Sequence, residues 1–107
     1  KDLKGIYATN ESSAIGAVKA LQELKKKPGE LAVIGFDSGA AQIDAIKSGL
    51  MAGAITQDPI GIGYKTVQAL VAFLKDGTVP PTFIDTGFYY YTKDNMNEPN
   101  IAAVLYQ

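Results

Sequence analysis

Three segments of the chain are apolar without alternating in polarity: residues 5–10, 31–37 and 52–58. Strands that are buried on both faces, as in a parallel sheet, have continuous apolar runs, whereas half-exposed strands alternate. Each of the three segments is followed by residues with helical periodicity. The pattern therefore predicts three parallel strands, each followed by a helix.

The segments after the predicted strands place apolar residues at the spacing of an amphipathic helix. One helix is expected after Asn10 and another after Asp37. The third has the clearest end signals, because Asp58 can cap it, Pro59 suits its first turn and Gly77 can close it. Repeated strand–helix units joined by right-handed connections predict an α/β fold, an open doubly wound parallel sheet with flanking helices.

The last quarter of the chain departs from this alternation. Pro80 and Pro81 interrupt it, and residues 82–91 form a β-prone run that ends in four aromatic residues. We expect this run to be a strand that is covered by a helix or lies against a partner. After a turn-like stretch, residues 101–106 are expected to form a short strand or helix.

The composition narrows the possible functions. The chain has 107 residues, which fits one small domain, and its net charge is -1. All ten basic residues are Lys, and Cys and His are absent, so the usual thiol nucleophile, general base and soft metal ligands are missing. The lack of Arg and the slightly acidic balance argue against nucleic acid as a partner. We expect no enzyme activity, no cofactor and no metal.

The sequence contains no apolar run long enough to span a bilayer, so we expect no membrane insertion. It begins at Lys1 and shows no signal-peptide core. We expect a processed chain or a piece of a longer one.

Polar side chains follow each predicted strand, at the edge where open parallel sheets bind their ligands. These are Asn10, Asp37 and Gln57. Helix capping is an alternative explanation for Asn10 and Asp37, but it explains Gln57 poorly because Gln is not a favoured cap. Two amides and one carboxylate offer donors and acceptors suited to a neutral polyol, and they lack the cation that a phosphate would need.

The same strand ends carry a family resemblance. The stretches GIYATNESSAIGAVKAL (5–21) and LAVIGFDSGAAQIDAIKSGLMAGAITQDPIGIGYKTVQAL (31–70) resemble the C-terminal lobe of ribose-type periplasmic sugar-binding proteins of ABC transporters. The resemblance implies that Asn10, Asp37 and Gln57 bind sugar hydroxyls. It also implies an exported protein, periplasmic or extracellular.

The resemblance further implies a domain organisation. Residues 1–91 would form a partial C-terminal lobe, and residues 92–107 would pack on a missing N-terminal lobe or on a partner such as a second copy of the chain. The hinge between lobes would fall at Asp85, Thr86 and Gly87. Without the earlier strand–helix units of that lobe, the first strand should have one unpaired edge.

Two functions remain open from the sequence. The first is part of a solute-binding protein that captures a monosaccharide or similar polyol and delivers it to an ABC transporter permease. The alternative is the ligand-binding domain of a lactose-repressor-type transcription regulator.

Overall fold

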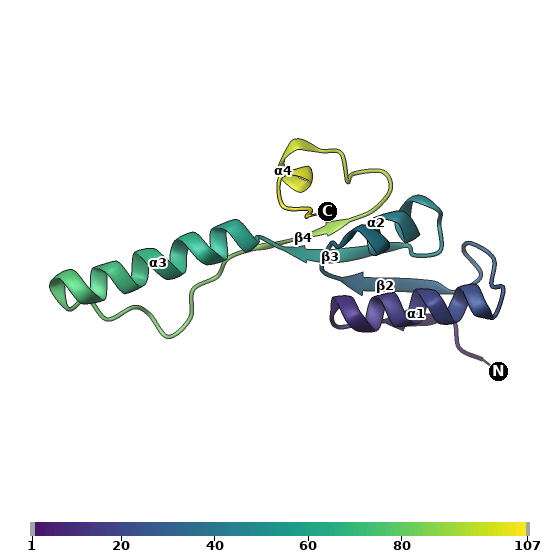
Figure 1. The fold of residues 1–107 in the computed structure, drawn as a ribbon, viewed down its shortest axis with the longest axis horizontal. Coiled ribbons are helices and arrows are strands. Elements are labelled where there is room, and N and C mark those ends of the chain that lie inside the picture. Colours follow the sequence, from purple (N-terminus) through teal and green to yellow (C-terminus); the bar gives the residue numbers. More distant parts are fainter. Residues whose placement is uncertain (1, 107) are drawn as a thin grey trace.

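Four strands form one sheet in the computed structural model, which describes residues 2–106. Strands β1 (Gly5–Tyr7), β2 (Ala32–Phe36) and β3 (Gly53–Gln57) are parallel and lie in chain order. Figure 1 shows β2 and β3 side by side. The three predicted parallel strands are therefore confirmed. Strand β4 (Phe88–Tyr91) pairs with β3 and runs antiparallel to it, so the sheet is mixed rather than wholly parallel. Strand β1 lies at the edge, as expected.

Helices α1 (Glu11–Glu23) and α2 (Ala40–Lys47) pack on one face of the sheet. Gly35 of β2 shows how closely they approach, because a Cβ atom there would collide with Gln42 of α2 and touch Ala14 of α1. Glycine at this position therefore leaves room for the side chains that pack over β2, and it is not needed there for its backbone angles. The prediction of a helix after each of the first two strands is confirmed.

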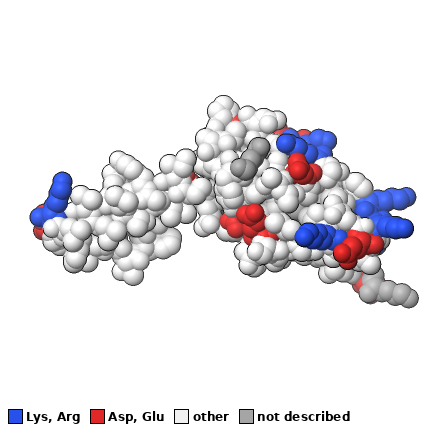
Figure 2. Space-filling view, in the orientation of Figure 1, with Lys and Arg blue, Asp and Glu red and all other residues white. Residues whose placement is uncertain are grey.

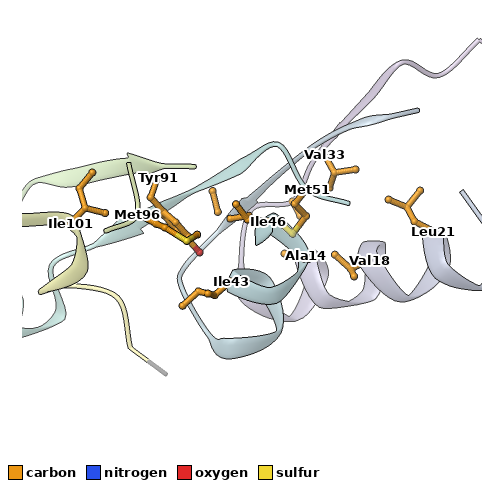
Figure 3. Close-up of a cluster of buried hydrophobic side chains, with 13 residues drawn as sticks. Ala14, Val18, Leu21, Val33, Ile43, Ile46, Met51, Tyr91, Met96 and Ile101 are labelled. Atoms are coloured by element: carbon orange, nitrogen blue, oxygen red, sulfur yellow. The ribbon is translucent and has the colours of Figure 1, made fainter. Parts of the chain in front are cut away.

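The hydrophobic core lies between this face of the sheet and the elements that cover it. Figure 3 shows Val18 and Leu21 of α1 and Ile46 of α2 pointing into the core. Met96 and Ile101, from the last part of the chain, join the same cluster and are 5% and 4% exposed. The core therefore combines the start and the end of the sequence.

Residues 92–106, the described part of the last segment, contribute Met96 and Ile101 to the chain's own core. They do so because β4 returns to the sheet beside β3 and leaves the following residues on the covered face. The expectation that residues 92–107 also pack on a second lobe or a partner stays a prediction. The segment expected as a strand or helix at 101–106 contains a short helix, α4 (Pro99–Ala102), which starts slightly earlier.

The opposite face of the sheet is open. Its strand pairing places Tyr7, Phe88 and Tyr90 on this face, and they are 54%, 68% and 43% exposed. Within residues 2–106 no helix covers these side chains. A doubly wound sheet has helices on both faces, so the described chain forms one half of that arrangement.

Helix α3 (Pro59–Asp76) projects away from the sheet and buries none of its residues (Figure 1). Its end signals are as predicted: Asp58 accepts a hydrogen bond from the Gly61 N–H at 2.9 Å, and Gly77 closes it with a φ of 73°. The chain then returns along α3 to β4. We call residues 58–87 the arm, and residues 5–57 and 88–106 the body.

The arm lies outside the hydrophobic core and gives the molecule its extents of 58 × 29 × 17 Å. The expectation that residues 1–91 form one partial lobe stays a prediction. Figure 2 shows that the visible surface of the arm is nearly uncharged except near the end of α3. No helix among residues 2–106 is both long and apolar enough to cross a membrane.

Candidate ligand-binding site

The carboxyl ends of the three parallel strands meet at one edge of the sheet, which we call the strand-end site. Asn10, Asp37 and Gln57 all lie at this edge because β1, β2 and β3 run in the same direction and in neighbouring positions. The N-termini of α1, α2 and α3 begin at the same edge. The structure therefore brings together the residues that the sequence singled out.

Asn10 caps α1. Its Oδ1 accepts a hydrogen bond from the Ser13 N–H at 2.9 Å, and the Ser13 hydroxyl interacts in return with the Asn10 backbone. The capping alternative is thus correct for this residue, but capping uses only the oxygen of the side chain. Among the described residues, the Asn10 Nδ2 has no hydrogen-bond partner, and the side chain is exposed. A cap residue can therefore still donate to a ligand.

Asp37 does not cap the helix that follows it, because the N-cap of α2 is Gly39. The Asp37 Oδ2 instead accepts from the backbone N–H of Glu11, at the start of α1, at 3.3 Å. Its own N–H donates to the Ile55 carbonyl at 2.7 Å, and its carbonyl accepts from the Tyr91 hydroxyl at 2.8 Å. Its Oδ1 has no partner within residues 2–106, so one carboxylate oxygen remains available.

Gln57 ends β3 directly opposite Phe88, and its side chain is exposed. It borders a shallow pocket that is also lined by Phe36, Ile55 and Gly87. Its amide makes no hydrogen bond to any other residue that the structure describes, since Asp58 supplies the cap of α3. Both its donor and its acceptor are therefore free for a ligand.

The predicted hinge residues lie where the arm returns to the body. The N–H of Gly87 donates to the Asp85 Oδ1 at 2.8 Å, and Gly87 has a φ of 79°, which glycine adopts without strain. Thr86 lies between them and is half-buried. Lys65 of α3 donates to the Asp85 carbonyl at 2.7 Å. Since Gln57 faces Phe88, the two connections between the body and the arm are neighbours.

Sequence reasoning missed a buried polar cluster behind the site. The Ser38 hydroxyl accepts from the Thr56 hydroxyl at 3.1 Å and from the Tyr106 N–H at 3.3 Å. The Tyr106 hydroxyl donates to the Glu11 carboxylate at 3.0 Å. Ser38 and Thr56 are fully buried. No local pattern could reveal this cluster, because its partners are up to 95 positions apart in the sequence.

Tyr91 was also missed as a site residue. It was treated only as part of an aromatic strand, yet its buried hydroxyl contacts the backbone of Asp37. Burial, with the nearby charges of Glu11 and Asp37, raises the pKa of Tyr91 well above its ordinary value. The hydroxyl therefore stays protonated and remains a donor across the physiological range.

The strand-end site is an exposed edge of the sheet, and its polar side chains have atoms without a hydrogen-bond partner among the described residues. It offers an amide donor, a carboxylate oxygen and a whole amide, with no lysine among them. Within residues 2–106 no group of three or more acidic side chains could hold a metal ion. Groups of this kind bind hydroxyls well, because each hydroxyl both donates and accepts.

Residues 1–78 match the family model of the periplasmic binding protein domain, in agreement with the open α/β sheet and its flanking helices. This match covers most of the chain, so the chain belongs to the periplasmic binding protein family.

Relatives in sequence are sugar-binding proteins by name. The ribose import binding protein RbsB of Haemophilus influenzae is 39% identical over 74 residues, which are 69% of this chain and 24% of that protein. The xylose/arabinose-binding protein XylF of Sulfolobus acidocaldarius is 32% identical over 111 aligned positions, covering 99% of this chain and 27% of the relative. The chain thus spans about a quarter of the length of these relatives.

Two solved structures that are similar to this chain are transporter solute-binding proteins with a bound sugar. An ABC transporter solute-binding protein from Agrobacterium vitis, bound with α-D-tagatopyranose, superimposes with a TM-score of 0.90 at 36% identity, over 99% of this chain and 35% of that one. A carbohydrate transporter solute-binding protein from Agrobacterium radiobacter, in complex with D-arabinose, gives 0.85 at 35% identity, over 96% and 34%. The resemblance to ribose-type sugar-binding proteins and the open α/β sheet with flanking helices are confirmed.

Proposed function

We propose that this chain is part of a solute-binding protein that captures a monosaccharide or similar polyol and delivers it to an ABC transporter permease. The observation that carries the proposal is the convergence of Asn10, Asp37 and Gln57 at one sheet edge, each with polar atoms left over. The names of the relatives in sequence and structure support the same ligand class.

Each of the three residues has a separate role in this proposal. The Asn10 Nδ2 donates to a sugar hydroxyl, and the Asp37 Oδ1 accepts from one. Gln57 does both. The bond to Asp37 is charge-assisted and therefore the strongest of the set. The sugar leaves unchanged, so the proposed role is binding and not catalysis.

The arm suggests how the site closes. The strand-end site is open, and a sugar on it would be covered only on one side. We propose that α3 packs on a second lobe, an N-terminal lobe outside these residues, because its apolar face is exposed throughout. Asp85, Thr86 and Gly87, together with the exit after Gln57, would then form the hinge. A sugar that contacts both lobes favours the closed form, because only that form makes both sets of contacts.

The proposed location is outside the cytoplasm, periplasmic or extracellular, in keeping with the family to which the chain belongs. The second candidate function is the ligand domain of a lactose-repressor-type regulator. It is favoured by one solved structure from Brachyspira murdochii, named as an ABC transporter, LacI family transcriptional regulator, which has a TM-score of 0.81 at 36% identity over 96% of this chain. A DNA-binding segment in the longer protein would support this second candidate over the first.

The test is sugar binding by the longer protein that contains this chain. Calorimetric titration with D-ribose, D-arabinose, D-xylose and D-fucose should show saturable binding of at least one of them. Asp37→Asn should weaken that binding strongly, because it removes the charge from the carboxylate. Asp44→Asn is the matched control, since Asp44 is an exposed carboxylate on α2 away from the site. Binding of none of the sugars, or equal affinities in the two variants, would contradict the proposal.

A further inference from the structure

Asp37 has a left-handed backbone, with a φ of 74°. Few residues with a side chain adopt this region, and aspartate is among those that adopt it most often. The conformation occurs directly after β2, at the strand-end site. The contacts that Asp37 makes with its surroundings can therefore select this conformation over others.

The surroundings fix Asp37 from three sides. Its N–H is bound to the Ile55 carbonyl of β3 at 2.7 Å, and its Oδ2 is bound to the Glu11 N–H of α1 at 3.3 Å. Its carbonyl accepts from the Tyr91 hydroxyl of β4 at 2.8 Å. The partners of the first two contacts are backbone atoms, whereas the partner of the third is the side chain of Tyr91. A substitution at Tyr91 can therefore remove the third contact and leave the other two in place.

Tyr91 is well placed for such a role. It is fully buried, so its ring cannot drift away from Asp37. It is the last residue of β4, and its pairing with Ala54 fixes its position along the sheet. The neighbouring Tyr89 and Tyr90 make no side-chain hydrogen bond to any described residue. The hydroxyl of Tyr91 thus has a specific partner, whereas those of its neighbours do not.

We infer that Tyr91 is a positioning residue for the ligand-binding carboxylate: its hydroxyl holds the Asp37 backbone left-handed and so aims the free Oδ1 at the ligand. This inference rests on the proposed function of the strand-end site. A carboxylate that is held in place before the ligand arrives loses less freedom on binding, which is why the contact strengthens affinity without touching the ligand.

The test compares Tyr91→Phe with Tyr90→Phe in the longer protein. Tyr91→Phe keeps the ring and removes only the hydroxyl. For whichever sugar of the panel the unmodified protein binds, we expect Tyr91→Phe to weaken affinity about two- to tenfold, the effect of one hydrogen bond. Tyr90→Phe should leave affinity unchanged. Equal affinities for the two variants would overturn the inference while leaving the proposed function intact.

A double substitution separates positioning from general stability. Asp37→Gly accepts the left-handed backbone but has no carboxylate to aim. In the Asp37→Gly background, Tyr91→Phe should therefore cause no further loss of affinity. A further loss of the same size as in the unmodified background would show that Tyr91 acts by another route and would overturn the inference.

A measurement without sugar completes the design. In protein labelled at aspartate, the ¹³C chemical shifts and the HN–Hα coupling of Asp37 report its φ. We expect Tyr91→Phe to change them and Tyr90→Phe to leave them alone. If no sugar of the panel binds, the proposed function fails, and these signals alone decide the inference about the Asp37 backbone. Unchanged signals in Tyr91→Phe would overturn it.

Discussion

Helices α1 and α3 have apolar residues at the same helical spacing, but among residues 2–106 only α1 buries its apolar side chains. α1 buries Ala14, Val18 and Leu21 against the sheet, and those side chains are at most 7% exposed. In α3, Val67 is 59% exposed and Leu74 is 79% exposed. Both helices have side-chain caps at their N-termini, so local sequence stabilises both in the same way.

The difference between the body and the arm shows what helical periodicity can specify. It selects the face that is to be buried, but it does not say which segment will cover that face. For α1 the covering segments are in the chain, whereas for α3 they are not among the described residues. An isolated helix of this length is marginal in water, so packing decides whether it stays formed.

Hydrogen exchange should give the largest contrast between these two helices. In the 107-residue chain we expect amides of α3 to exchange at least about 100-fold faster than amides of α1, because α3 opens without unfolding the body. Equal protection in α1 and α3 would break the comparison and would show that α3 has found a partner, such as a second copy of the chain.

Truncation in the core should have the next largest effect. Ile46→Ala removes a side chain that is 1% exposed, and we expect it to lower the free energy of unfolding of the body by about 2–5 kcal/mol. Urea unfolding followed by tyrosine fluorescence measures this change. A loss below about 1 kcal/mol would mean that the body is not close-packed around α2.

Removal of the cap of α3 should have a smaller and more local effect. Asp58→Ala removes the acceptor for the Gly61 N–H, and we expect the stability of α3 to fall by about 1 kcal/mol. Helicity measured by circular dichroism should drop while the urea midpoint of the body stays the same. A shift of that midpoint would show that the arm and the body unfold together.

Truncation on the arm should have the smallest effect. In the 107-residue chain, Leu74→Ala should change the free energy of unfolding by less than about 0.5 kcal/mol, because the side chain is already exposed. The same substitution in the longer protein should cost about 2–5 kcal/mol if a second lobe buries Leu74 there. Equal small effects in both would argue against that lobe as the partner of α3.

Local signals in the sequence were sufficient to predict the order of the three parallel strands and the polar residues that follow them. Continuous apolar runs revealed β1, β2 and β3, and the polar residue after each run marked the sheet edge at which the proposed site lies. The capping of α1 by Asn10 and of α3 by Asp58 was also readable, since capping depends on neighbours in the chain.

The remaining features depend on contacts between distant residues. Tyr91 and Asp37 are 54 positions apart, and nothing near either residue indicates that they touch. The direction of β4 depends on where the arm returns, so the sheet could not be recognised as mixed. The positions of Met96 and Ile101 in the core follow from that return as well.

The direct pairing of Gln57 with Phe88 has a consequence for how such a protein can change over time. Paired residues of an antiparallel ladder are close enough to be joined by a two-residue turn. Residues 58–87 are therefore, in topological terms, an insertion into a β-hairpin. Its length and sequence can diverge, or one insertion can be exchanged for another, while the register of β3 and β4 and the strand-end site beside them are preserved.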